Sequence, residues 1–271
     1  MFGRGIEYKT PDQIRRMRTA GLVVADIHDA VRAAIAPGVT TGELDQVAAQ
    51  VLQAAGATSN FLGYHGFPGR LCVSVNSEIV HGIPGARVIQ PGDVVSVDAG
   101  AVVEGWHGDA AFTVVVPAEG GVDPADEALV RTTEDAMWAG IAALATGRRL
   151  GDVGAAVQDA AADYGIVREY TGHGIGTAMH QEPDVYNYRT GRRGPALRPG
   201  LCVAVEPMLT RGGEATRTLA DDWTVVSADG SRAAHVEHTV ALHSGGLWVL
   251  TARDGGAAGL SAHGVQVAPL D

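Results

Sequence analysis

The sequence contains little cysteine, no excess of positive charge and no long apolar run, and each shortage excludes a class of protein. Two cysteines in 271 residues exclude a disulfide scaffold and fit a reducing compartment. There are 20 lysines and arginines against 31 aspartates and glutamates, so the net charge of −11 argues against a nucleic-acid partner. No apolar run approaches the roughly 20 residues that cross a bilayer, and the first residues hold no signal-peptide core. We expect a soluble cytoplasmic protein without membrane contacts. We also expect a monomer, because no symmetric interface is evident.

An internal repeat is the most informative feature that the sequence does contain. Residues 91–98 read turn, strand and carboxylate, and residues 199–206 repeat this order. Two shorter matches accompany it in the same order, residues 38–44 with 147–153 and residues 81–83 with 173–175. Internal repetition constrains architecture before any single residue is interpreted. It predicts one domain built from two similar halves, about residues 10–120 and 121–250.

Helix and strand signals agree with two halves. Capping residues or proline mark the start of three helices, at Thr10-Pro11, at Thr40 with Glu43, and at Asp123-Pro124. A fourth helix is expected from about residue 152 to 164. Seven strands are expected at residues 71–75, 94–98, 112–116, 201–206, 223–227, 236–242 and 248–250. This order predicts an α+β architecture in which two helix pairs cover one face of an antiparallel sheet. We expect a single domain over residues 1–251 and a flexible tail over residues 252–271, where glycine and alanine dominate.

Strand pairing brings four carboxylates together. The segment from Asp98 to Asp109 reads as a hairpin that turns just before Gly105, which places the two aspartates opposite each other with Cβ atoms roughly 5 Å apart. A strand leaving Glu206 and a strand returning to Glu237 would do the same in the second half. Unpaired carboxylates at such distances repel each other and raise a pKa, and a bound cation relieves both effects.

His173, which has glycine on both sides, completes an oxygen-rich ligand set. The set is too hard for a structural zinc site and suits a pair of divalent ions such as Mn, Fe or Co. Two ions roughly 3.5–4 Å apart hold a hydroxide and polarise a carbonyl, as a hydrolase requires. Each residue also has an ordinary explanation as a turn aspartate, a strand-end glutamate or a hydrogen-bonded loop histidine. The joint order and the repeat favour the metal site.

Seven motifs make the sequence similar to a known family. They are Tyr64-His65-Gly66-Phe67-Pro68, Val80-His81-Gly82-Ile83-Pro84, Ser96-Val97-Asp98, His107-Gly108-Asp109, Gly172-His173-Gly174-Ile175-Gly176, Val205-Glu206-Pro207-Met208 and Val236-Glu237-His238-Thr239. Together they resemble the type I methionine aminopeptidases of the bacterial form, without an N-terminal extension. The resemblance implies the pita-bread fold. It also implies removal of the initiator methionine from nascent polypeptides, which are met at the ribosome, when the second residue is small.

The resemblance further implies a role for individual residues. Five of them correspond to the ligands of two divalent ions, whose identity among Mn, Fe, Co and Zn stays open: Asp98, Asp109, His173, Glu206 and Glu237. In this scheme Asp109 and Glu237 bridge the ions, Asp98 chelates one of them, and His173 and Glu206 complete the other shell. Glu206 is also implied as the proton shuttle that acts on the attacking water. His81 and His180 correspond to histidines that contact the substrate, although spacing alone allows a structural role for both.

A methionine pocket is implied by the same resemblance. Its walls would be Tyr64, Phe67, Cys72 and Trp223, with Phe61 and Met179 nearby. An unbranched thioether suits a narrow apolar and aromatic slot, although such residues also form ordinary cores. Three positions depart from the family pattern. Phe61 replaces a small residue, Met179 replaces an aromatic residue, and Gly100 stands where a hydroxyl residue is common. These departures affect the expected shape of the pocket rather than the chemistry.

Four alternative functions are considered beside this resemblance. Proline-specific peptidases of the same fold carry a large additional N-terminal domain, whereas this chain reaches its first helix by Thr10. Type II methionine aminopeptidases carry a helical insertion, for which the interval from Glu206 to Glu237 has no room. A related peptidase with another N-terminal specificity stays open. An inactive pita-bread protein that only binds partners is disfavoured, because such proteins lose metal ligands and all five are present here.

Overall fold

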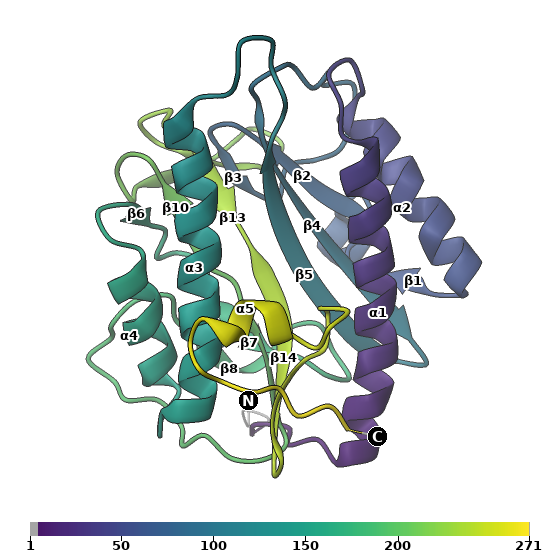
Figure 1. Cartoon of the computed structure of the whole chain (residues 1–271). Helices are drawn as coiled ribbons and strands as arrows, with labels where there is room; N and C mark the ends of the chain where they lie inside the picture. The colour runs from purple at the N-terminus through teal and green to yellow at the C-terminus, as the bar shows by residue number, and fades with distance from the viewer. Residues whose placement is uncertain (1–4, 271) are drawn as a thin grey trace.

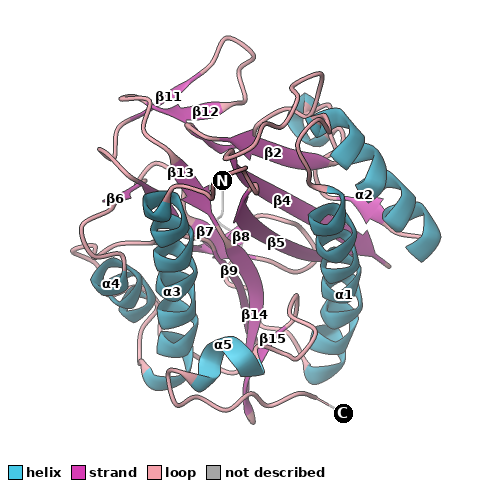
Figure 2. Ribbon diagram, turned by 45° about the horizontal axis from the view of Figure 1, so that its top comes forward, coloured by secondary structure: helices cyan, strands magenta, loops and turns pink. Residues whose placement is uncertain are grey.

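Two pairs of helices lie over a curved sheet (Figure 1). The structure is a computed structural model that describes residues 5–270. The first pair is α1 (Pro11–Ala34) with α2 (Thr41–Ala55), and the second is α3 (Pro124–Thr146) with α4 (Gly151–Ala160). Helices α1 and α3 cross the front of the sheet, and α2 and α4 lie at their outer sides (Figures 1 and 2). The two predicted helix pairs are therefore confirmed.

Local capping fixes where these helices begin. Thr10 and Thr40 are the N-caps of complete capping boxes at α1 and α2. At α3 the carboxylate of Asp123 accepts a hydrogen bond of 2.9 Å from the backbone N–H of Ala125. Helix α4 ends at Ala160 rather than near residue 164, because Ala162 adopts a left-handed φ of 53° that cannot continue a right-handed helix.

The central sheet has nine strands. Along its main path the order is β1-β4-β5-β14-β9-β7-β8, with β2 beside β4 and β15 beside β14, and the pairings are antiparallel. The strands are β1 (Thr58–Ser59), β2 (Leu71–Val75), β4 (Val94–Val103), β5 (Trp106–Val115), β7 (Gly172–Gly174), β8 (Gln181–Val185), β9 (Leu201–Val205), β14 (Glu237–His243) and β15 (Gly246–Val249). Six of the seven predicted strands lie in this sheet, with boundaries that differ by a few residues, and the seventh, at residues 223–227, is present in a smaller sheet.

The two halves meet where β5 pairs with β14. From this junction the order runs outward as β5, β4 and β2 in the first half and as β14, β9 and β7 in the second. The predicted pseudo-twofold α+β architecture is confirmed. One of the three sequence matches does not follow this symmetry. His173 lies on β7, next to β9, whereas His81 follows β3 (Glu78–Val80) outside the central sheet, so that match is coincidental.

The connection from β9 to β14 builds further layers. One small sheet has the order β13-β10-β6 and another has the order β11-β12-β3. Their strands are β6 (Gly165–Ile166), β10 (Met208–Thr210), β11 (Thr216–Thr218), β12 (Val225–Ser227) and β13 (Ala233–His235). A short 3₁₀ helix, η1 (Tyr64–Gly66), lies between β1 and β2. Since β12 pairs with β3, the two halves are joined a second time.

Each half has its own apolar core between helices and sheet. In the first half Val24 and Leu44 of the helices are fully buried in one cluster with Val97 of β4. In the second half Ile141 of α3 is fully buried in one cluster with Val240 of β14. Burial of apolar area on this scale is the main driving force for folding.

The segment from residue 252 to residue 270 is folded, contrary to the expected flexible tail. After Ala252 the chain forms α5 (Ala257–Ser261), whose Leu260 is fully buried in the core of the second half. The backbone N–H of Ala268 then donates to Leu247 O at 2.7 Å, and Nε2 of His243 donates to Ala268 O at 2.6 Å. Composition alone suggested disorder, but a few apolar residues at the right spacing are enough to dock the segment. The domain limit at residue 251 stays an untested prediction.

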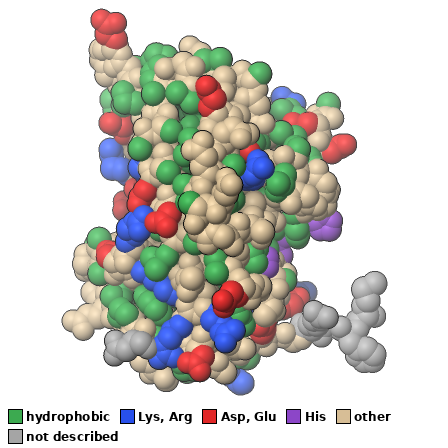
Figure 3. Space-filling model, turned by 90° about the vertical axis from the view of Figure 1, so that its right-hand side faces the viewer, with side chains coloured by type: hydrophobic (Ala, Val, Ile, Leu, Met, Phe, Trp, Pro, Cys, Tyr) green, Lys and Arg blue, Asp and Glu red, His purple; other side chains and the backbone are tan. Residues whose placement is uncertain are grey.

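Charged residues are distributed over the surface. On the side of the molecule that carries α1 and α2, acidic, basic and apolar side chains are interspersed (Figure 3). Arg253, near the end of the chain, pairs with Asp26 and Asp29 of α1. Within residues 5–270, no helix is both long enough and apolar enough to cross a membrane.

Candidate active site

The five expected ligands lie on five adjacent strands of the central sheet. Asp98 lies on β4, Asp109 on β5, Glu237 at the start of β14, Glu206 directly after β9, and His173 on β7. The order of these strands in the sheet is β4-β5-β14-β9-β7, so their side chains line one continuous strip. The pseudo-twofold relation pairs Asp98 with Glu206 and Asp109 with Glu237. The repeat in the sequence is therefore a repeat of ligand positions.

The register of the first hairpin differs from the prediction. Asp98 pairs with Ala111, and Asp109 pairs with Gly100, so the two aspartates are diagonal rather than directly opposite. The reason is the turn: Glu104 and Gly105 have φ values of 50° and 78°, as a tight two-residue hairpin turn requires. The turn thus lies one residue later than expected. Diagonal neighbours on one face still lie within reach of each other, so both carboxylates serve the same site.

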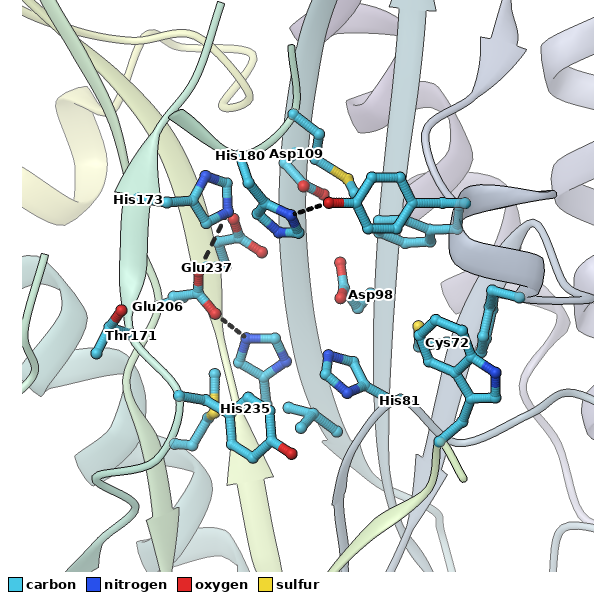
Figure 4. Close-up of a pocket in the computed structure, with 18 residues that line it drawn as sticks. Cys72, His81, Asp98, Asp109, Thr171, His173, His180, Glu206, His235 and Glu237 are labelled. Atoms are coloured by element: carbon cyan, nitrogen blue, oxygen red, sulfur yellow. Dashed lines mark hydrogen bonds and ion pairs between the residues drawn. The ribbon is translucent and has the colours of Figure 1, made fainter. Parts of the chain in front are cut away.

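The ligand atoms converge on one point. Atoms of Asp109, His173 and Glu237 all lie within 4.8 Å of one another. Nε2 of His173 lies 3.4 Å from a carboxylate oxygen of Glu206. Figure 4 shows these four side chains pointing toward a shared space, with Asp98 at its other side. The structure therefore brings together all five residues that the sequence singled out.

The electrostatics of the cluster suit a bound cation. Burial raises the pKa of Asp98 to about 7. Burial also raises the pKa of Asp109, Glu206 and Glu237 well above the usual range, and neighbouring carboxylates raise each one further. Among the described residues, one oxygen each of Asp98, Asp109 and Glu237 is buried without a hydrogen-bond partner. Buried carboxylate oxygens without partners fit divalent cations, which suit oxygen ligands.

The tautomer and the protonation state of His173 suit a metal ligand. Its Nδ1–H donates a hydrogen bond of 3.0 Å to Gly174 O, which leaves the lone pair of Nε2 facing Glu206. Burial lowers the pKa of His173 to about 3, so the ring is neutral at pH 7 and cannot balance the carboxylates. A backbone carbonyl that fixes the tautomer in this way is the usual arrangement around metal-binding histidines.

A cavity of about 290 Å³ opens beside this cluster. One wall is apolar: Phe61, Phe67, Cys72 and Met179 are buried and pack together, with Tyr64 and Trp223 at the edge. The rings of Phe67 and Trp223 lie edge to face with centroids 5.0 Å apart. All six residues expected to form a methionine pocket line this one cavity, together with the five acidic and histidine ligands.

Two histidines line the same cavity, beside the aromatic residues at the edge of the apolar wall. His81 lines it with a left-handed φ of 60°, a strained conformation that persists most often at functional sites. Nδ1 of His180 is hydrogen-bonded to the hydroxyl of Tyr64 at 2.8 Å, which joins the two halves across the cavity (Figure 4). Burial lowers the pKa of His81 to about 4 and also lowers the pKa of His180. Both rings are therefore neutral near pH 7 and able to exchange hydrogen bonds with a substrate.

Some cavity residues escaped the sequence analysis. His235 is 2% exposed, its Nε2 lies 3.7 Å from Glu206, and burial lowers its pKa to about 3. The sequence did contain a signal for His235. It precedes Glu237 by two positions in an extended segment, and alternate residues of a strand share a face, so its side chain should lie on the same face as Glu237. The other lining residues that were not singled out are Val80, Tyr170, Thr171 and Met208.

Comparison with known proteins places the chain in a class. The description "Metallopeptidase family M24" matches residues 15–244, and the chain belongs to that family. It is 48% identical over 257 residues to methionine aminopeptidase 1 of Mycobacterium tuberculosis, with 92% of this chain and 96% of the relative covered. It is 43% identical over 245 residues to methionine aminopeptidase 1 of Bacillus subtilis, with 90% and 98% covered. The crystal structure of methionine aminopeptidase from Thermotoga maritima superimposes with a TM-score of 0.87 at 38% identity, covering 91% of this chain and 99% of that one.

Proposed function

We propose that this chain is a metal-dependent aminopeptidase that removes an N-terminal methionine when the next residue is small. The observation that carries the proposal is the joint lining of one cavity by an apolar slot and by five convergent ligands. The slot of Phe61, Phe67, Cys72 and Met179 suits an unbranched thioether side chain. The fold and the family, which are shared with methionine aminopeptidases, support the same conclusion.

The ligands would hold two divalent ions. Asp109 and Glu237 stand at the centre of the strip and would bridge the ions, Asp98 would bind on one side, and His173 with Glu206 on the other. Bound ions lower the pKa of a water molecule and polarise the carbonyl of the scissile bond. We propose two ions, and the peptide panel described below tests which of Mn, Fe, Co and Zn supports turnover.

Proton transfer is the task of Glu206. Burial and the neighbouring Asp98 raise its pKa, so that without a cation it holds a proton readily. Its carboxylate lies between His173 and His235 at the edge of the cavity, where it can take a proton from the attacking water and deliver it to the leaving amine. His81 and His180 would hold the substrate backbone. The linked pair Tyr64 and His180 would narrow the cavity at the edge of the methionine pocket, which limits the space left for the second residue.

A peptide panel tests the function. Peptides Met-Xaa-Yaa, in which Xaa is Gly, Ala, Leu or Arg, are incubated with the enzyme and with Mn, Fe, Co or Zn in turn. We expect methionine release ahead of Gly and Ala and little release ahead of Leu and Arg. The matched peptide Leu-Ala-Yaa tests the pocket and should be cleaved poorly. Preferential cleavage of Xaa-Pro peptides would instead support a proline-specific peptidase. Failure to bind any of these metals would support an inactive binding protein.

Nascent chains at the ribosome are the proposed source of substrate. A group of exposed arginines supports contact with an anionic surface: Arg148, Arg149, Arg192, Arg193 and Arg198. Backbone hydrogen bonds from Leu150 to Pro195 and from Leu197 to Arg148 bring the two segments that carry them together. Co-sedimentation with ribosomes that is lost at high salt, or on replacement of Arg192 and Arg193 by Glu, would agree with this proposal. Cytoplasmic location and a monomeric state stay predictions.

A further inference from the structure

A buried amide beside the ligands has no role in the site described so far. Asn60 is only 7% exposed and lies just after β1. Its Nδ2–H donates to Gly108 O at 3.0 Å, and its Oδ1 accepts from Nδ1–H of His107 at 3.0 Å. One side chain therefore holds two consecutive residues of β5 directly before the ligand Asp109.

The backbone of Asp109 is fixed from the other half of the chain. Its N–H donates to Oγ1 of Thr239 at 3.0 Å, and the Thr239 hydroxyl donates to its carbonyl at 2.7 Å. Asn60 thus holds the two residues before Asp109 from the first half of the chain, and Thr239 holds Asp109 itself from the second.

Gly100 leaves the space that Asn60 occupies. Gly100 is the cross-strand partner of Asp109, and the backbone N–H of Asn60 donates to Gly100 O at 3.2 Å. A Cβ atom added to Gly100 would lie 2.6 Å from Cγ and 2.7 Å from Cβ of Asn60, which is closer than real Cβ contacts allow. A side chain at residue 100 and the amide of Asn60 therefore compete for one volume beside Asp109.

We propose that Asn60 is a positioning residue for the ligand Asp109 and that Asn60 and Gly100 form a compensating pair. The amide fills the volume next to residue 100 and supplies there the polar group that a hydroxyl side chain at residue 100 would otherwise supply. It acts through the His107–Asp109 segment and does not touch substrate. The inference rests on the proposed assignment of Asp109 as a metal ligand.

A set of four variants separates positioning from simple packing. They are Asn60→Ala, Gly100→Ser, Asn60→Ala with Gly100→Ser, and Asn60→Ala with Gly100→Ala as the matched control. Affinity for Mn²⁺ alone is measured by calorimetry, and thermal melting of each metal-free variant reports its folding. Both readouts are independent of catalytic turnover.

We expect Asn60→Ala to fold and to bind Mn²⁺ about ten- to a hundredfold more weakly, the usual effect of removing a group that orients a ligand. Gly100→Ser alone should melt at a lower temperature, because the added Cβ meets Asn60. The double variant with serine should recover most of the affinity, since its hydroxyl enters the vacated space. The double variant with alanine should recover melting temperature but not affinity. If Asn60→Ala folds poorly, Asn60→Ser replaces it in the same comparison.

Wild-type affinity in Asn60→Ala would overturn the proposal. Equal recovery by the alanine and serine double variants would also overturn it, because packing alone would then explain the pair. A wild-type chain that binds no Mn²⁺ is a different result: it would refute the ligand assignment on which the proposed function depends. The two failures are thus distinguished by the wild-type measurement.

Discussion

The two halves of the central sheet carry equivalent strand pairs but join them in different ways. In the first half, β4 and β5 are linked by a two-residue turn at Glu104 and Gly105. In the second half, the chain between β9 and β14 builds β10, β11, β12 and β13 before it returns. Met208, Trp223 and His235, which line the cavity, all come from this longer connection. The symmetric strands therefore carry the candidate metal ligands, and the asymmetric connection adds part of the lining of the cavity beside them.

The largest effect is expected from a comparison of the equivalent carboxylates Asp98 and Glu206. Glu206→Gln should lower kcat by about 10²–10⁴ even at saturating metal, because a proton shuttle is lost together with a ligand. Asp98→Asn should mainly weaken metal binding and should regain much of its rate in excess Mn²⁺. Steady-state kinetics over a metal titration measure both. Equal rescue of the two variants by metal would contradict the assignment of Glu206 as the shuttle.

Removal of the folded end of the chain tests whether the second core depends on it. Leu260→Ala should lower the free energy of unfolding by about 2–5 kcal/mol, since the side chain is fully buried. A chain that ends at residue 252 should lose at least as much. As a control, Arg253→Ala removes only exposed ion pairs and should cost less than about 1 kcal/mol. Unchanged urea unfolding of the truncated chain would mean that the segment contributes nothing to stability.

The contacts between helix and sheet also differ between the halves. His28 of α1 packs edge to face on Phe112 of β5, whereas Trp138 of α3 packs on His238 of β14. Burial lowers the pKa of His28 to about 3, and its Nε2–H donates to Ala110 O at 2.9 Å. The native state therefore keeps this ring neutral while the unfolded state binds a proton below pH 6.5. Stability is present above that pH and is lost as the pH falls toward 3.

A substitution makes this acid sensitivity measurable. His28→Gln keeps an amide donor near the position of Nε2, within reach of Ala110 O, but does not titrate. Between pH 6 and pH 4, its free energy of unfolding should fall less steeply than that of the wild type, by about 1.4 kcal/mol per pH unit. Chemical denaturation at a series of pH values provides the test. Parallel curves for the two proteins would show that His28 is protonated in the native state as well.

The smallest effect is expected where the halves touch across the cavity. Tyr64→Phe removes the hydroxyl that bonds Nδ1 of His180 at 2.8 Å. A partly exposed hydrogen bond of this kind contributes about 0.5–1.5 kcal/mol, so KM for Met-Ala peptides should change a fewfold with little change in kcat. Phe67→Leu, within the apolar wall, serves as a control that should alter discrimination between methionine and leucine instead. A large loss of kcat in Tyr64→Phe would give the hydroxyl a role in the chemistry.

Much of the site could be predicted because its signals are local. Capping residues fixed the helix starts, and the repeated turn and strand placed Asp98 and Glu206 at equivalent points. The hairpin register could not be predicted as well, because it depends on which residues take positive φ in the turn. An error of one turn residue moves the cross-strand partner of Asp98 from Ala111 to Asp109. The fold of the last segment was missed because Leu260 is buried by contacts with residues far away in the sequence.

The role of Asn60 shows a second limit of sequence reasoning. The sequence showed that residue 100 is a glycine where a hydroxyl residue is common, but it did not show that Asn60 occupies the neighbouring space. Asn60 and Gly100 are far apart in sequence and meet only because β1 lies against β4. Compensation between such positions depends on volume, which one sequence does not report.

The placement of the ligands has a consequence for assembly. No fragment confined to one half contains the full set, because Asp98 and Asp109 precede the junction of the halves whereas His173, Glu206 and Glu237 follow it. Ions held by these five residues would act as a reversible cross-link between distant parts of the chain, and they would stabilise only the state in which β5 and β14 are already paired. Metal supply would then govern how long the completed protein survives, in addition to how fast it works.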